Sequence, residues 1–176
     1  ALLTVLVTRP LNFGRAFGWL LNDIVSLGVF NRNALGVVFR FVAAAKLARY
    51  IIQNNIAHSH VHFAHVPTDI GMYAACMSGT TFSVISHDND IFQSGWLLKQ
   101  KIKRSQFFVT ISEFNKAYLS KLAPQLKNKI QVIYCGVDTS QFTFQAPQNN
   151  DVFTFGFLAR LVEKKGLEYL IKACKK

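Results

Sequence analysis

The stretch that decides the fold is Thr81-Phe-Ser-Val-Ile-Ser86, together with the polar residues His87-Asp-Asn-Asp90 that follow it. Its first six residues are β-branched, aromatic or small, which is typical of a short buried strand. His87 and Asp90 then stand at the carboxyl end of that strand, the edge of a parallel sheet where ligands bind. The stretch therefore predicts both a sheet and the place of a site on it.

The same pattern repeats on either side of this stretch. Short apolar strands that alternate with helices predict an α/β fold, with a parallel sheet and helices on both faces. Strands are predicted at 56–63, 81–86, 106–111 and 130–134. Helices are predicted after Pro67, at 96–103, and after the N-cap Ser112, the last with Phe114, Ala117, Tyr118 and Leu122 inward.

Residues 11–53 have the spacing of two amphipathic helices, with a break at Gly28 and residues 31–33. Basic residues in this part outnumber a single acid, Asp23. Such helices suit an anionic membrane surface, although we favour an ordinary solvated face. The predicted inward residues are Phe13, Phe17, Leu20, Ile24 and Leu27 in the first helix, and Leu35, Val38, Val42, Ala45 and Ile52 in the second.

The composition is that of a basic globular chain. Of 176 residues 51% are hydrophobic, and the net charge of +11 indicates phosphorylated ligands, an anionic membrane or nucleic acid. Nucleic acid is disfavoured, because the basic patch Lys99, Lys101, Lys103 and Arg104 has no aromatic residues interleaved with it. We predict that this patch is solvated helix surface. No apolar run approaches the roughly 18–20 residues of a membrane span.

The cysteines bear on the cellular compartment. Cys76, Cys135 and Cys174 are odd in number, far apart and flanked by apolar residues. Small buried thiols in a reduced, cytoplasmic protein are the interpretation that fits this pattern best.

The last part of the chain predicts an anion site. A polar stretch at 143–151 is the predicted linker, and residues 153–157 alternate like a strand. Leu167 begins a helical period, and the loop before it carries Arg160, Lys165 and Gly166. Fixed cations beside the positive end of a helix attract a phosphate or diphosphate.

Histidines are the other candidates for chemistry. His87 can donate or accept a hydrogen bond near neutral pH. Asp88 or Asp90 could accept a hydrogen bond from a substrate hydroxyl or cap the following helix. The cluster His58, His60, His62 and His65 is the nearest approach to a zinc site. No carboxylate or cysteine pattern completes a ligand shell, so we predict no metal.

Taken together, these segments resemble glycosyltransferase family 4, the retaining nucleotide-sugar transferases of the GT-B fold, and most closely its exopolysaccharide or colanic-acid branch. The matching pieces occur in the family's order. They are His60-Val-His-Phe-Ala64, Ser86-His-Asp-Asn-Asp-Ile-Phe92, Val109-Thr-Ile-Ser-Glu-Phe-Asn115, Ile130-Gln-Val-Ile-Tyr-Cys-Gly-Val-Asp138 and Gly156-Phe-Leu-Ala-Arg-Leu-Val-Glu-Lys-Lys-Gly166.

The resemblance implies two Rossmann-like domains. Residues 1–142 would belong to the acceptor-side domain, 143–151 to the linker, and 152–176 to the first strand and helix of the donor domain. Arg160, Lys165 and Gly166 would hold the diphosphate of a UDP- or GDP-sugar, which is a substrate; no cofactor is implied. His87 would contact the transferred sugar, Asp90 would shape the acceptor side, and 136–138 would be the interdomain crossover.

The resemblance also implies an acceptor that is a saccharide or is lipid-linked, and a place in the cytoplasm or on the inner face of the plasma membrane. The family's first strand with its glycine-rich loop, and most of its donor domain, have no counterpart in this sequence. We therefore expect a fragment that is inactive alone. Two alternatives stay open: a non-catalytic nucleotide- or phosphate-binding module, and a zinc hydrolase built on residues 58–65.

Overall fold

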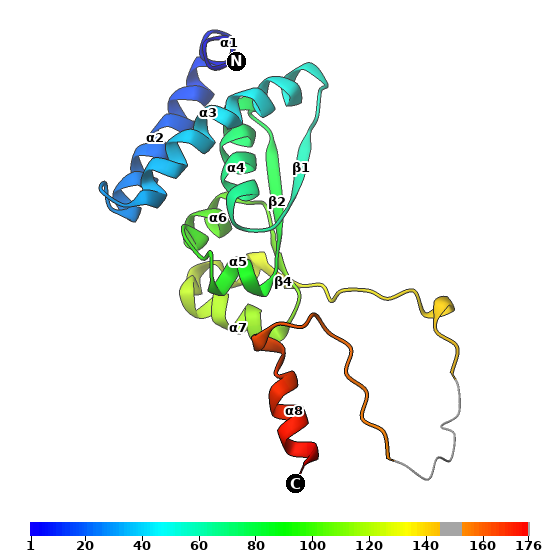
Figure 1. Ribbon diagram of the computed structural model, residues 1–176. Helices are drawn as coiled ribbons and strands as arrows, with labels where there is room; N and C mark the ends of the chain where they lie inside the picture. Colours follow the sequence, from blue (N-terminus) through cyan, green and yellow to red (C-terminus); the bar gives the residue numbers. More distant parts are fainter. Residues whose placement is uncertain (145–152, 176) are drawn as a thin grey trace. The chain divides into compact units, whose positions relative to one another are not determined.

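Figure 1 shows the computed structural model of the chain, which describes residues 1–144 and 153–175. The chain divides into two compact units, Ala1–Gly136 and Val137–Lys176. This boundary comes a few residues before the predicted one at 142. Residues 145–151 of the predicted linker lie outside the described residues, so the linker and the two domains stay a prediction.

The first unit is built on a four-stranded parallel sheet in the order β1-β2-β3-β4. This confirms the predicted α/β class, a parallel sheet with flanking helices. The four strands predicted between residues 56 and 134 all form, and 81–86 forms with its predicted bounds. The strands are β1 (His58–His62), β2 (Thr81–Ser86), β3 (Phe108–Thr110) and β4 (Ile130–Val132).

Helical segments join these strands, and they share one face of the sheet (Figure 1), so the prediction of helices on both faces is wrong. Strands paired in chain order with right-handed crossovers place every connection on the same side. Phe82, Val84 and Phe108 are buried on that side, whereas His60 and Gln131 on the other side are exposed. The connecting segments are α4 (Val66–Ser78), α5 (Asp88–Phe92), α6 (Leu98–Arg104), α7 (Glu113–Leu122) and the 3-10 helix η1 (Pro124–Lys129).

Two further helices, α2 (Pro10–Leu27) and α3 (Arg32–Gln53), pack against α4, and α1 (Leu2–Thr8) packs against these two. The helical prediction for 11–53 is confirmed, and α1 was not predicted. Asn31 caps α3 by accepting the Asn33 N–H at 2.9 Å. In the described part of the chain, no helix is long and apolar enough to cross a membrane.

The predicted inward face of α3 is largely wrong. Leu35 and Val42 are 62% and 46% exposed, because α3 turns a row of small residues, among them Ala44 and Ala48, towards its neighbours. Small side chains allow the neighbouring helices to approach this face closely, and the predicted residues Leu35, Val38 and Val42 lie outside it. Phe17 of α2 is likewise half exposed.

The predicted inward face of α7 is also wrong in part. Phe114 is 73% exposed, and the buried residues of this helix are Asn115 and Leu119. The rings of Phe114 and Tyr118 lie 6.0 and 5.0 Å from the ring of Phe92, so they form an aromatic cluster on the surface. The predicted cap is confirmed, since Ser112 Oγ accepts the Asn115 N–H at 3.2 Å.

The second unit contains the short 3-10 helices η2 (Thr139–Gln141) and η3 (Glu163–Lys165), and the helix α8 (Leu167–Cys174). The helix predicted from Leu167 is confirmed. The strand predicted at 153–157 is not formed. A strand needs a hydrogen-bonded neighbour, and the described residues of this unit contain no other strand to pair with it.

The cysteine prediction holds for one residue of three. Cys76 is buried in α4, whereas Cys135 and Cys174 are exposed. Burial raises the pKa of the Cys76 thiol above its ordinary value. The apolar neighbours of Cys135 and Cys174 in the sequence do not cover these two side chains.

Candidate active site

The candidate site of the first unit lies where β1 and β2 end. The parallel register aligns His62 with Ile85, and the Phe63 N–H continues the ladder to the Ile85 carbonyl at 2.9 Å. The loop 63–65 and the start of α5 at His87 therefore lie side by side. This is the carboxyl edge of the sheet that the sequence predicted for the site.

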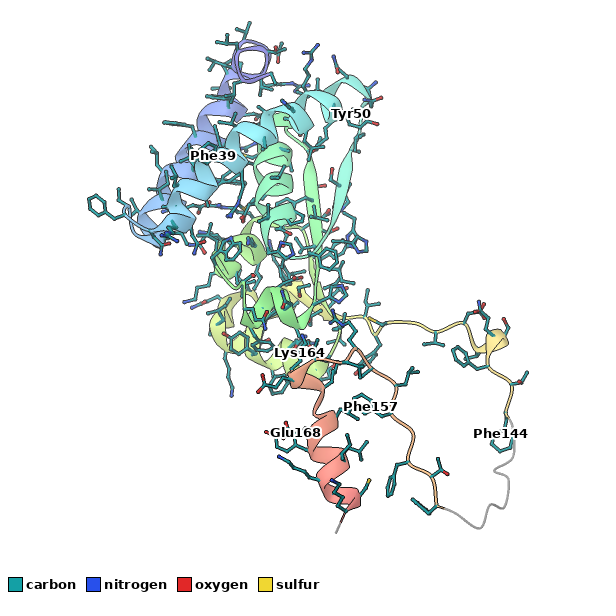
Figure 2. All side chains as sticks on the ribbon, viewed as in Figure 1. Phe39, Tyr50, Phe144, Phe157, Lys164 and Glu168 are labelled. Atoms are coloured by element: carbon teal, nitrogen blue, oxygen red, sulfur yellow. The ribbon has the colours of Figure 1, made fainter. Side chains whose placement is uncertain are left out.

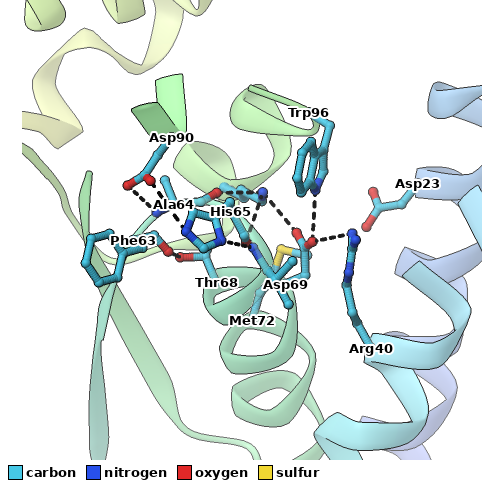
Figure 3. Close-up of polar contacts among 12 residues, drawn as sticks. Asp23, Arg40, Phe63, Ala64, His65, Thr68, Asp69, Met72, Asp90 and Trp96 are labelled. Atoms are coloured by element: carbon cyan, nitrogen blue, oxygen red, sulfur yellow. Dashed lines mark hydrogen bonds and ion pairs between the residues drawn. The ribbon is translucent and has the colours of Figure 1, made fainter. Parts of the chain in front are cut away.

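Asp90 joins these two loops. Its Oδ2 accepts the backbone N–H of Ala64 at 3.0 Å, and its Oδ1 lies 3.6 Å from His65 Nε2 (Figure 3). The same Oδ2 accepts the backbone N–H of His87 at 3.0 Å. The carboxylate is 1% exposed. Asp90 is the third residue of α5. An acid at this position caps the helix by accepting the N–H of the residue that precedes the helix, which is His87 here. Of the two roles weighed from the sequence, capping is the one observed.

His87 is held through its backbone, and its ring is half-buried. The ring centre lies 5.3 Å from that of Phe63, which in turn stacks on His65 at 5.7 Å. Phe63 has a φ of 73°, a left-handed conformation that is costly for a residue with a side chain. Strain of this kind is found at functional sites, where surrounding contacts hold it in place.

A second link ties α5 to α7. Asn115 is buried, and its Nδ2 donates to Asp88 Oδ1 at 2.7 Å. The loops after β1 and β2 and the helix after β3 are thereby cross-linked along one edge of the sheet. From the sequence, Asp88 was a candidate for the same two roles as Asp90, and nothing indicated that Asn115 would be its partner.

The first unit also contains a buried ionic cluster that was not predicted from the sequence. Asp69 Oδ2 accepts from Arg40 Nη1 at 2.9 Å and from Trp96 Nε1 at 3.0 Å, and its Oδ1 lies 3.0 Å from Lys101 Nζ. Asp23 binds Arg104 in a bidentate pair at 2.6 and 2.8 Å. Figure 3 shows the first of these groups.

The prediction of a solvated patch is therefore wrong for two of its four residues. Lys101 is fully buried and the Arg104 side chain is only 8% exposed, because each has a buried carboxylate partner. Lys99 and Lys103 of the same helix are exposed as predicted. One signal in the sequence could have predicted these pairs. Asp69 is an acid inside an apolar helical segment, and a buried carboxylate requires a cation as partner.

The histidines of β1 make hydrogen bonds with hydroxyl groups of β2. His58 Nδ1 and Nε2 lie 2.7 and 2.8 Å from Thr81 Oγ1 and Ser83 Oγ, and His60 Nδ1 lies 2.7 Å from Ser83 Oγ. Burial, then the neighbouring His62 and His58, lower the pKa of His60. Within residues 1–144 and 153–175, no group of His, Cys, Asp and Glu side chains is arranged to hold a metal ion. His65 caps α4, its Nδ1 accepting the Val66 N–H.

The predicted phosphate loop belongs to the second unit. Arg160 and Lys165 are exposed, and Gly166 has a φ of 73° at the junction between η3 and α8. A residue with a side chain would be strained there. Figure 2 shows Lys164, the neighbour of Lys165, at the turn that leads into α8. The loop thus combines cations with a helix start, as predicted.

The fold and site define a Rossmann-like α/β domain that presents polar side chains at the carboxyl edge of a parallel sheet. The model of the family described as Glycosyltransferase Family 4 matches residues 7–141. The chain belongs to this family, whose members use a nucleotide-sugar donor and an acceptor. A comparison with curated proteins found no match. The family match includes His87 and Asp90 and ends before the loop at 160–166.

One prediction separates the two roles of Asp90. Replacement by alanine leaves the N–H groups of Ala64 and His87 unsatisfied, and we expect it to lower the free energy of unfolding by about 1–3 kcal/mol. Asp90→Asn keeps an oxygen that can accept both hydrogen bonds, so most of the stability should remain. Chemical denaturation measures both variants.

The rate of sugar transfer by Asp90→Asn then distinguishes the capping role of Asp90 from a role in the reaction. A transferase whose Asp90 acts only as a cap should retain most of its rate in Asp90→Asn. A variant that is stable and yet loses the rate would show that the carboxylate charge itself takes part in the reaction.

Proposed function

We propose that the protein is a retaining hexosyltransferase. It would transfer a sugar from a UDP- or GDP-sugar to a polysaccharide or lipid-linked acceptor, in exopolysaccharide biosynthesis of the colanic-acid type. The observation that carries this proposal is the His87 backbone, fixed by Asp90 at the carboxyl edge of the sheet. Membership of glycosyltransferase family 4 supports it further.

The proposed roles follow from the chemistry of the transfer. The bond between the anomeric carbon and the diphosphate oxygen breaks, the acceptor oxygen bonds to that carbon, and the hydroxyl proton leaves with the diphosphate. Negative charge develops on the diphosphate, and Arg160 and Lys165 would offset it. His87 would contact the transferred sugar, and Asp90 would shape the acceptor side through the loops that it caps.

The test is acceptor-dependent release of UDP or GDP from a panel of nucleotide sugars. We expect release by the enzyme when the acceptor is present, and none when the acceptor is left out. The configuration of the product at the anomeric carbon, read by NMR, tests retention. Nucleotide binding with no release under any of these conditions would favour the alternative, a non-catalytic nucleotide-binding module.

An anionic membrane is the proposed further partner, in keeping with a place on the inner face of the plasma membrane. Apolar side chains are exposed on the first three helices, among them Leu11 (87%) and Phe39 (69%). Figure 2 shows Phe39 on α3. Lys46 and Arg49 of the same helix are also exposed. Exposed apolar and basic side chains on one set of helices suit the surface of an anionic leaflet.

Liposome flotation tests this partner. The chain is expected to float with vesicles that contain phosphatidylglycerol and to float less with phosphatidylcholine alone. Replacing Lys46 and Arg49 by glutamine should reduce flotation, because each basic residue near such a surface contributes about 1 kcal/mol. A chain whose flotation does not depend on lipid charge would remove the membrane from the proposed partners.

A further inference from the structure

We propose that Lys101 is a positioning residue of the active site, whose buried ammonium group fixes the loop 63–65 and, through Asp90, the backbone of His87. In this proposal Lys101 acts through the loop and does not touch the substrate. Its effect on the reaction rests on the proposed function, whereas its hold on the loop is a property of this chain alone.

The contacts of Lys101 converge on the last two residues of the loop. Its Nζ donates to the carbonyl oxygen of Ala64 at 2.6 Å and to that of His65 at 3.4 Å, and lies 3.0 Å from Asp69 Oδ1. The side chain is fully buried, and its ammonium group lies 5.3 Å from the centre of the Trp96 ring. An ammonium group has three protons to donate, and these acceptors surround it.

Packing alone does not explain a charged group at this place. Burial lowers the pKa of Lys101, and the Asp69 carboxylate opposes that shift. A buried ion pair is often no more stabilising than apolar side chains of similar volume. Asp69 also has Arg40 and Trp96 as partners. What Lys101 adds to the cluster, and an apolar side chain could not, is a donor for the two loop carbonyls.

The peptide groups of Ala64 connect Lys101 to the site. The Ala64 carbonyl accepts from Lys101, and the Ala64 N–H donates to Asp90 Oδ2. The same oxygen atom of Asp90 accepts the N–H of His87. Hydrogen bonds on either side of Ala64, joined through its main chain, therefore link the buried ammonium group to the backbone of the predicted catalytic histidine.

The loop needs such support because its first residue is strained. Phe63 has a φ of 73°, and a left-handed conformation of this kind costs about 1–3 kcal/mol unless neighbouring contacts determine it. Thr68 Oγ1 donates to the Phe63 carbonyl at 2.8 Å, which holds one side of the loop. Lys101 holds the next two carbonyls.

Hydrogen exchange of backbone amides tests the hold on the loop. In Lys101→Met, the amides of Ala64 and His87 are expected to exchange at least about tenfold faster relative to that of Leu119, a buried residue of α7 that reports global opening. Lys103→Met is the matched control, since Lys103 lies on the same helix and is exposed. It should leave these ratios unchanged.

The outcomes decide the proposal. Exchange at Ala64 and His87 that stays in step with Leu119 would overturn it. Should Lys101→Met fail to fold, Lys101→Gln serves the same comparison, because its amide can donate to one carbonyl; a smaller but still selective acceleration is then expected.

Kinetics of the intact enzyme test the link to the reaction. Displacement of a catalytic group by about 1 Å can cost 10²-fold in rate, so Lys101→Met should lower kcat by about 10- to 100-fold and leave the donor KM nearly unchanged. A rise in KM alone, or normal kcat with a loosened loop, would overturn the link. If the loop loosens and the wild-type enzyme transfers no sugar, the proposed function fails and the hold on the loop stands.

Discussion

Asp23→Asn is expected to lower the free energy of unfolding by about 3–5 kcal/mol, the cost of removing one partner from a buried ion pair. Asp23 is fully buried on α2. Its two oxygens accept from Arg104 at 2.6 and 2.8 Å, and Tyr73 Oη donates to Oδ2 at 2.6 Å. An asparagine offers one acceptor in place of two and carries no charge.

The loss is large because the partners stay where they are. The Arg104 guanidinium lies 4.5 Å from the centre of the Trp19 ring, which keeps water from one of its faces. Burial, and then the Asp23 carboxylate, raise the pKa of Tyr73 far above its ordinary range, so its hydroxyl remains a donor. The variant would leave a guanidinium and a phenol in the interior without their shared acceptor.

Urea denaturation followed by tryptophan fluorescence measures this effect, because both tryptophans, Trp19 and Trp96, lie in the first unit. Glu113→Gln is the control. Glu113 is an exposed acid in the first turn of α7, so its loss should cost only about 0.3–1 kcal/mol. The double variant Asp23→Asn with Arg104→Met should recover part of the lost stability. Equal losses in Asp23→Asn and the control would contradict the account.

Local patterns predicted the strands and several helix ends. The run Thr81–Ser86 has the composition of a strand throughout, and Gly79 ends α4 in a left-handed conformation that favours glycine. Such signals act within a few residues, so a single sequence contains them. The α/β class follows from their alternation.

Helix faces and strand pairing depend on what packs alongside. In α3, apolar residues occur on two sides of the helix, and the neighbouring helices select the side that carries Val37 and Ala44. The run at 153–157 alternates like a strand, yet among the described residues no strand pairs with it. Periodicity gives the candidates, and tertiary contacts choose among them.

Buried charges were the least predictable feature. Asp23 and Arg104 are 81 residues apart in the sequence, and Lys101 lies between two exposed lysines. A hydropathy pattern places such cations in solvent by default. At the site, the end of the strand predicted at 81–86 indicated the position of His87. The position of Asp90, three residues later, was compatible with a helix cap. That Ala64 shares this cap could not be predicted, because it depends on the register of β1 against β2.

Lys165→Ala is expected to reduce sugar transfer by the intact enzyme by about 10²–10³-fold, the usual effect of removing one group that stabilises charge in a transition state. In the proposed site, Lys165 offsets the charge that develops on the diphosphate. Its effect should therefore appear mainly in kcat. Arg160→Ala should cause a loss of similar size, and the two losses should not add if both residues bind one diphosphate.

Lys164→Ala is the matched control, because Lys164 is the adjacent residue, has the same charge and is also exposed. A general effect of positive charge near the donor would reduce transfer equally in the Lys164 and Lys165 variants, and that result would contradict a specific diphosphate contact. Loss of nucleotide binding in Lys165→Ala, with no transfer by the wild-type enzyme, would instead support the binding module. A large loss of sugar transfer that is confined to the Arg160 and Lys165 variants would support a role of the basic loop in the reaction proposed for His87.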